Sequence, residues 1–238
     1  LNKKGPDFER NKDRILDKIK VVDSTFLTTS PDVLKFLRNE NSFYIPNPSD
    51  KSFEILDNYN NSCNIDVFFA LSHGVHRGVL KSGKTDDRIT FLNNLTEKTP
   101  DVKFDLYGIG KIQPIWADHY FKTISNAKMG LNLSRGNAIK YYSSDRITQI
   151  VGNGLVCLID EKTQYRDFFS DNEMVFYNNL NDLSEKIQKV SGDDKLRRKI
   201  GKNGKKKYMK YFNSSLVAEF IINKTLGIEN KKKFFWHN

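Results

Sequence analysis

The stretch that decides the fold is Lys140–Asp160, which reads KYYSSDRITQIVGNGLVCLID. It predicts a polar loop, a short helix, a Gly-x-Gly turn and an apolar buried strand. Immediately before it, Met129–Ser134 (MGLNLS) predicts another buried strand. The polar loop therefore lies where a strand ends and a helix begins, which in an open α/β sheet is the edge that binds ligands.

The start of the predicted helix suits a phosphate or diphosphate. Ser143 or Ser144 could serve as its N-cap, and its first amides carry free N–H groups at the positive end of the helix dipole. Arg146 adds a full charge in the first turn, and Gln149, one turn later on the same face, can hydrogen-bond a hydroxyl. An ordinary strand–loop–helix unit with Arg146 in an ion pair fits equally well, because no complete phosphate-loop pattern is present.

Outward from this stretch, apolar strands and amphipathic helices alternate along the chain. Strands are expected at 65–71, 102–107, 129–134, 155–159 and 174–177, and helices at 87–97, 114–127, 145–151, 180–190, 195–211 and 214–226. Strands that alternate with helices predict an α/β fold, a doubly wound parallel sheet with right-handed crossovers.

A shorter α/β segment precedes these elements. The pattern predicts a charged helix over 9–20, strands over 21–28 and 43–45, and a helix over 31–38 with Ser30 as its cap. Prolines at 46 and 48 then stop regular structure, because proline cannot donate to a ladder. Residues 46–64 are rich in Asn, Ser and Asp, and within them 51–64 are expected to form a linker.

The composition is that of a folded protein of 238 residues. Hydrophobic residues make up 38% and aromatic residues 12%, which argues against disorder. The longest apolar runs, 65–71 and 155–159, are far too short to cross a bilayer, and no charged-then-apolar leader opens the sequence. Cys63 and Cys157 lie far apart without ligand spacing, which fits a reducing compartment. We therefore expect a cytoplasmic location.

The net charge of +10 is concentrated at the C-terminal end. Residues 192–238 contain thirteen Lys or Arg and four Asp or Glu, whereas residues 1–191 contain twenty-six and twenty-five. The segment 195–212 predicts a basic amphipathic helix, and the tail 231–236 combines lysines with aromatic residues. Both could bind an anionic membrane surface; alternatively they are a solvated helix face and a frayed tail. Nucleic acid is disfavoured as a partner because no reader motif accompanies the charge.

Polar and glycine residues follow three predicted strands and should converge on one rim of the sheet. They are Ser72 and His73, Gly108 to Gly110, and the loop from Ser134 to Arg146. The glycines would let backbone approach a base or ribose closely, although they also fit an ordinary tight turn. His73 would donate a hydrogen bond near the ligand, and with His76 alone as a second histidine no metal site is expected. No nucleophile–base pair or spaced carboxylate pair is present, so no catalytic residue is assigned.

Several of these motifs occur together in one known family. The run Tyr120–Asp160 places Asn-Ala-Lys before a Gly-Leu-Asn strand, then Ser-Ser-Asp-Arg-x-x-Gln and Gly-x-Gly. This order resembles the C-terminal domain of GT-B glycosyltransferases and is most similar to the CgeB-like branch of the group-1 enzymes. The resemblance extends over residues 65–225. It implies a Rossmann-like domain that binds a nucleotide-diphosphate sugar.

The resemblance also implies a donor site at the rim. Its residues are expected to be Ser72, His73, Gly108, Gly110, Ser144, Arg146 and Gln149. Arg146 and the helix amides would hold the diphosphate, Gln149 the ribose, and the turn at Gly108 would lie near the base. No cofactor besides the nucleotide sugar and no metal is expected. The acceptor would be an envelope polysaccharide or glycoconjugate, glycan or lipid-linked, at the inner face of the cytoplasmic membrane.

Finally, the resemblance implies a division of the chain into domains, and the chain differs from the family pattern in two respects. Residues 1–50 resemble the end of the family's N-terminal domain, 51–64 the linker, 65–226 the donor-binding domain, and 227–238 a basic aromatic tail. The family usually has Glu where this chain has Gln149, and most of the N-terminal domain is absent from the sequence. Glycosyl transfer is the first hypothesis; the alternatives are an inactive nucleotide-sugar-binding module, or a basic adaptor for membranes or nucleic acid.

Overall fold

The computed structural model describes residues 6–37, 41–71, 75–76, 79–80, 87–110, 112–134, 136–229 and 233–237. Its main element is a five-stranded sheet in which all neighbouring strands are parallel. The strand order is β6 (Phe104–Tyr107), β3 (Ile65–Ala70), β7 (Ala127–Asn132), β8 (Val156–Asp160), β9 (Val175–Tyr177). The chain moves from β3 outward to β6 and then returns to β7 on the other side of β3. This order confirms the predicted doubly wound sheet and places its switch point between β3 and β7.

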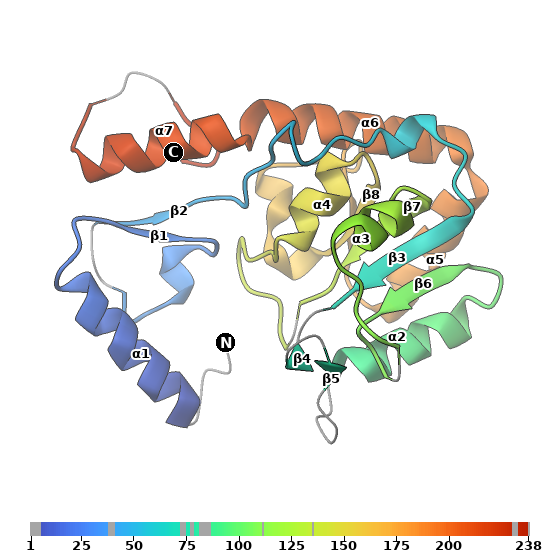
Figure 1. Ribbon diagram of the computed structural model, residues 1–238, viewed down its shortest axis with the longest axis horizontal. Helices are drawn as coiled ribbons and strands as arrows, with labels where there is room; N and C mark the ends of the chain where they lie inside the picture. Colours follow the sequence, from blue (N-terminus) through green and yellow to red (C-terminus); the bar gives the residue numbers. More distant parts are fainter. Residues whose placement is uncertain are drawn as a thin grey trace.

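Helices cover both faces of this sheet (Figure 1). They are α2 (Asp87–Lys98), α3 (Ala117–Ile124), α4 (Arg146–Gly152), α5 (Leu180–Gly192) and α6 (Asp194–Tyr211). One core contains buried residues of α3 and α4, the other contains those of α2 and α5, and α6 contributes to both. Val67 and Phe69 face the second core and Phe68 faces the first, because successive side chains of a strand point to opposite faces.

The N-terminal part of the chain contains a second, two-stranded sheet. The helix α1 (Pro6–Ile19) precedes it, and the strands β1 (Thr25–Leu27) and β2 (Ser42–Tyr44) lie within or beside the predicted strands and pair in parallel. A third sheet, formed by β4 (Val75–His76) and β5 (Val79–Leu80), is antiparallel. It lies in a region for which the sequence predicts only a loop.

The helix predicted over 31–38 is wrong. Pro31–Val33 form a single 3-10 turn, and Ser30 makes no capping hydrogen bond. The hydroxyl of Ser30 instead donates to the carboxylate of Asp32 (3.0 Å). A Ser hydroxyl that bonds a nearby side chain leaves the first-turn amides uncapped, which favours a short turn over a full helix.

The segment 51–64, predicted as a linker, is packed against α6 and runs beside it (Figure 1). Asn58 is fully buried, and its side-chain amide donates to the carbonyl oxygen of Ala127 at the start of β7 (2.9 Å). Nζ of Lys205 on α6 donates to the carbonyl oxygen of Leu56 (2.6 Å). The segment is therefore held along its length by contacts with the sheet domain.

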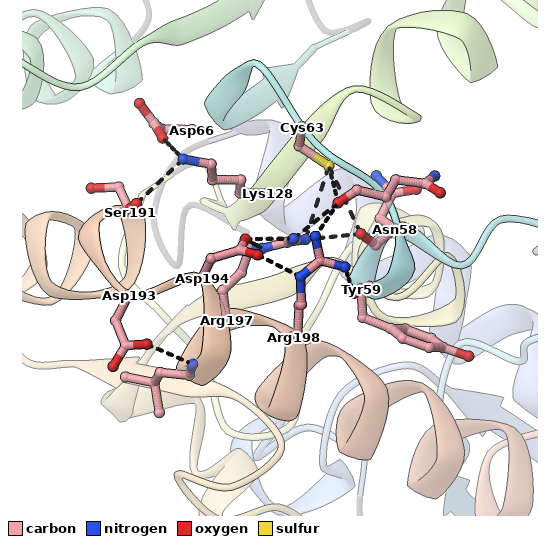
Figure 2. A network of polar contacts seen from close by, with 12 residues as sticks. Asn58, Tyr59, Cys63, Asp66, Lys128, Ser191, Asp193, Asp194, Arg197 and Arg198 are labelled. Carbon is pink, nitrogen blue, oxygen red and sulfur yellow. Dashed lines mark hydrogen bonds and ion pairs between the residues drawn. The ribbon is translucent and has the colours of Figure 1, made fainter.

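The buried guanidinium of Arg197, near the start of α6, anchors this segment (Figure 2). It donates to the carbonyl oxygens of Asn58 (2.8 Å) and Asn61 (3.0 Å), and its Nε donates to Asp194 (2.7 Å). A buried cation is tolerated when every side of it finds acceptors. Arg198 also pairs with Asp194, so the network joins the start of α6 to the chain that enters β3.

The described part of the C-terminal tail is packed rather than frayed. Phe234 and Trp236 are 7% and 6% exposed. Their rings lie 5.0 and 5.7 Å from the ring of Phe220 on α7 (Ser214–Thr225), between centroids. Packing against α7 removes the apolar surface of these two rings from water, which stabilises the folded protein. Phe234 and Trp236 are thus part of the core, whereas Phe235 between them is 37% exposed.

At Gly201 the backbone of α6 lies close to the backbone of the domain. A Cβ atom there would lie 2.4 Å from the carbonyl oxygen of Gly154. Although Ala is the better helix former, we expect Gly201→Ala to lower the free energy of unfolding by about 1–3 kcal/mol, because the clash is with backbone. The control Gly192→Ala, at the end of α5, meets no atom within 4 Å and should be neutral or stabilising. Equal stability of the two variants in urea denaturation would contradict the packing argument.

Candidate functional site

The carboxyl ends of β3, β6 and β7 meet at one edge of the sheet, beside the switch point. Arg146, the first residue of α4, reaches across this edge. Its Nε donates to the carbonyl oxygen of Ala70 at the end of β3 (3.1 Å), and its Nη1 to that of Leu133, just after β7 (3.2 Å). The arginine predicted at the ligand edge is therefore there, and it ties two strand ends together.

Within the described part of the chain, the guanidinium of Arg146 has no counter-ion. It lies over the ring of Phe69 (4.7 Å to the centroid), and Nη1 also donates to the hydroxyl of Ser144 (3.0 Å). No carboxylate pairs with it among the described residues, and Nη2 finds no acceptor there. Burial lowers the pKa of Arg146 to about 10, as expected for a partly desolvated, uncompensated cation. The ion-pair alternative thus finds no partner in these residues.

A second arginine, which the sequence analysis does not single out, lies close by. Arg88 is buried in the first turn of α2, and its positive charge also lowers the pKa of Arg146. In the same turn, Asp87 accepts a hydrogen bond from the backbone N–H of Gly136, in the loop after β7 (3.0 Å). The sequence signal for Arg88 is its place at the start of the helix that follows β3. Many structural arginines share that place.

The predicted N-cap is wrong. Asp145 precedes α4, and its side chain makes no capping hydrogen bond. The hydroxyl of Ser143 is buried against the hydroxyl of Tyr165 (2.9 Å), and that of Ser144 accepts from Arg146. Both serines are therefore engaged in tertiary contacts. Among the described residues no acceptor contacts the backbone N–H groups of Asp145 and Arg146, so amides remain available to an anion at this edge.

Gly108 and Gly110 form the tight turn after β6, with positive φ angles of 72° and 59°. A Cβ atom at Gly108 would lie 2.0 Å from the carbonyl oxygen of Leu71, so the fold itself requires glycine there. A Cβ atom at Gly110 would meet nothing within 4 Å. The tight-turn interpretation accounts for Gly108, whereas close approach of a ligand stays a prediction for Gly110.

Gln149 is partnered by a glutamate from a distant part of the chain. Its Nε2 donates to Oε1 of Glu54 (3.0 Å), and Glu54, which is 3% exposed, also accepts from the backbone N–H of Asp50 (2.7 Å). Burial raises the pKa of Glu54. Oε1 of Gln149 is buried without a partner among the described residues, and its contact with a ribose hydroxyl stays a prediction. An amide suits this position because it can donate to the buried carboxylate.

Two predicted donor-site residues, Ser72 and His73, lie outside the described residues, as does the side chain of His76. Within the described ranges, no group of three or more His, Cys, Asp or Glu side chains could hold a metal ion. In the same ranges, no helix is both long and apolar enough to cross a membrane.

Comparisons with known proteins agree with this architecture. A family model described as "Glycosyl transferase-like" matches residues 88–223, which is more than half of the chain. No similar sequence is found among curated proteins.

Solved structures share the fold at low sequence identity. A mutant of S. aureus TarM, in complex with fondaparinux, alpha-GlcNAc-glycerol and UDP, has a TM-score of 0.65 at 16% identity, over 91% of this chain and 46% of that one. Sucrose-phosphate synthase from Thermosynechococcus elongatus has a TM-score of 0.59 at 14% identity, over 84% of this chain and 57% of that one. An alpha-glucosyltransferase in complex with UDP and DNA has a TM-score of 0.59 at 14% identity, over 86% of this chain and 65% of that one. The chain spans about half the length of TarM, and at such identities the likeness shows the fold.

The contact between Gln149 and Glu54 predicts a pH-dependent cost for a glutamate at position 149. Gln149→Glu would bring two carboxylates together in a buried place, so we expect the free energy of unfolding to fall by about 1–3 kcal/mol near pH 8. Repulsion raises a carboxyl pKa in the folded state above its unfolded value. The folded protein therefore takes up a proton as the pH falls, and the cost should shrink toward about pH 5.

The matched control is the exchange of the two side chains, Glu54→Gln with Gln149→Glu. It again provides one carboxylate and one amide, so it should recover most of the lost stability. Urea denaturation across this pH range measures the wild type and both variants. A loss that does not change with pH, or no recovery in the exchanged variant, would contradict the contact.

Proposed function

The chain belongs to the glycosyl transferase-like family, and from this premise we propose that it transfers a sugar from a nucleotide-diphosphate sugar. The observation that carries the proposal is Arg146, a cation without a described counter-ion at the carboxyl edge of a GT-B-type sheet. Ligands of open α/β sheets bind at this edge, beside the switch point. A diphosphate would supply the negative charge that balances the guanidinium of Arg146.

The groups at this edge suit the chemistry of a leaving diphosphate. Nη2 of Arg146 and the amides of Asp145 and Arg146 have no acceptor among the described residues. Positive groups already in place stabilise the charge that develops on the leaving group as the glycosidic bond breaks. Because the guanidinium of Arg146 can provide this charge, metal-independent transfer is part of the proposal. No side chain is assigned as a base.

UDP is the nucleotide to test first. Two structures with the same fold, those of TarM and the alpha-glucosyltransferase, are complexes with UDP. For the acceptor we propose an envelope polysaccharide or glycoconjugate, glycan or lipid-linked, modified at the inner face of the cytoplasmic membrane. The excess of basic residues in 192–238 supports a place beside an anionic surface.

A nucleotide-sugar-binding module without activity is the second candidate. One observation favours it: Nε2 of Gln149 is occupied by Glu54. Both candidates require the donor site. They differ in sugar transfer to an acceptor, which the transferase performs and the module does not.

Calorimetric titration with UDP tests the donor site that both candidates share. We expect Arg146→Gln to weaken UDP binding about 10- to 100-fold, because a hydrogen bond from a charged donor to a diphosphate is lost. The matched control is Arg198→Gln, since Arg198 lies at the start of α6, where the segment 58–61 enters β3. It should bind UDP as the wild type does.

Arg146 also holds two strand ends, so thermal unfolding of each variant must accompany the titration. A folded Arg146→Gln variant with unchanged affinity would show that the diphosphate assignment is wrong. A wild-type chain that binds none of the common nucleoside diphosphates would overturn the donor site itself.

A further inference from the structure

The basic residues of α6 fall into two groups, those that pair with carboxylates and those that are exposed. On the side that faces the domain, Arg197 and Arg198 pair with Asp194, Lys205 pairs with Asp57 (3.0 Å), and Lys207 contacts Glu173 (3.7 Å). Five further lysines are exposed, and we call them the lysine row: Lys195, Lys199, Lys202, Lys206 and Lys210. No ion pair involving the lysine row occurs among the described residues.

The spacing of the lysine row places it on one face of the helix. Steps of three and four residues keep side chains on a single face, and fifteen residues of helix extend over roughly 22 Å. The apolar face of the same helix is not available to a partner, because Ile200 and Tyr208 are buried in the two cores. The helix therefore presents charge outward and keeps its apolar side inside.

Exposed aliphatic side chains lie at the far end of the next helix. Ile222, Leu226 and Ile228, which we call the aliphatic patch, are 53%, 67% and 51% exposed. Figure 1 shows α6 and α7 end to end along one side of the molecule. Large aliphatic side chains gathered at one exposed place mark a contact surface more often than single ones do.

A pocket of about 160 Å³ opens beside the aliphatic patch. Its lining includes Ile228 together with Lys224 and Lys233, and neither lysine pairs with a carboxylate among the described residues. Nζ of Lys224 lies over the ring of Phe43 (4.9 Å to the centroid). Unpaired cations next to exposed aliphatic groups match the boundary between phosphate headgroups and acyl chains.

From these observations we propose that the lysine row and the aliphatic patch form a surface that binds an anionic lipid bilayer. Each lysine adds attraction to anionic headgroups, and the aliphatic side chains enter the boundary between headgroups and acyl chains. A nucleic acid would use the cations but would leave the aliphatic patch in water. The lysine row lies in the segment 195–212 that the sequence predicts, whereas the aliphatic patch replaces the tail 231–236, because Phe234 and Trp236 are buried. The proposal requires no nucleotide and is independent of the donor site.

The first test is co-sedimentation with vesicles of equal parts phosphatidylcholine and phosphatidylglycerol, without any nucleotide. Replacing the five lysines of the lysine row by Gln should weaken binding at least about tenfold and flatten its salt dependence. The control replaces five other exposed lysines by Gln: Lys35, Lys51, Lys98, Lys122 and Lys162. It changes the net charge equally and should weaken binding less than about threefold if the row itself matters.

The second test separates apolar contact from charge. Leu226→Ser with Ile228→Ser should weaken vesicle binding several-fold while leaving its salt dependence unchanged. The control is Ile55→Ser with Ile112→Ser, since these side chains are 66% and 51% exposed elsewhere on the surface. It should bind as the wild type does.

Three outcomes would overturn the proposal. The first is that the wild-type chain binds anionic vesicles no better than vesicles of pure phosphatidylcholine. The second is that the two sets of five lysine substitutions weaken binding equally. The third is that the aliphatic variant and its control bind vesicles equally well. Duplex DNA is titrated in parallel. Binding to DNA through the lysine row, without binding to vesicles, would assign the surface to nucleic acid instead.

Discussion

The buried guanidinium of Arg197 is the contact on which the rest of the arrangement depends. A cation in the interior must be bonded on every side, and Arg197 finds its acceptors in the carbonyl oxygens of Asn58 and Asn61. This fixes the segment that leads into the main sheet. The same segment brings Glu54 to Gln149. A structural contact at the start of α6 thereby sets the surroundings of a predicted donor-site residue.

The two edges of the sheet differ in how their charges are compensated. Where β3 and β7 begin, Lys128 pairs with Asp66 (2.8 Å) and Arg197 pairs with Asp194. Where the same strands end, Arg146 is bonded to carbonyl oxygens and a hydroxyl. Carbonyl oxygens orient a guanidinium but do not cancel its charge. The charge of Arg146 is therefore not cancelled by its partners among the described residues, and an anionic ligand there would complete the compensation.

Much of the fold could be predicted because strands and helices of a buried parallel sheet have strong local signals. The run 65–71 and the helix 87–97 are found as predicted, to within a residue or two. The position of Arg146 at the ligand edge followed from the order of elements. The N-cap was wrong because Ser143 and Ser144 could each cap a helix by local rules. Contacts with Tyr165 and Arg146 engage their hydroxyls instead.

The sequence by itself determined the parallel sheet, the edge where Arg146 lies and the concentration of positive charge after residue 191, because these depend on periodicity, order and composition. The tertiary structure alone decided which groups meet. It paired Gln149 with Glu54, gave Lys205 and Lys207 carboxylate partners while the lysine row has none among the described residues, and buried Phe234 and Trp236 of the tail. Such contacts join residues far apart in the chain. Their energies depend on burial and geometry, which no local pattern encodes.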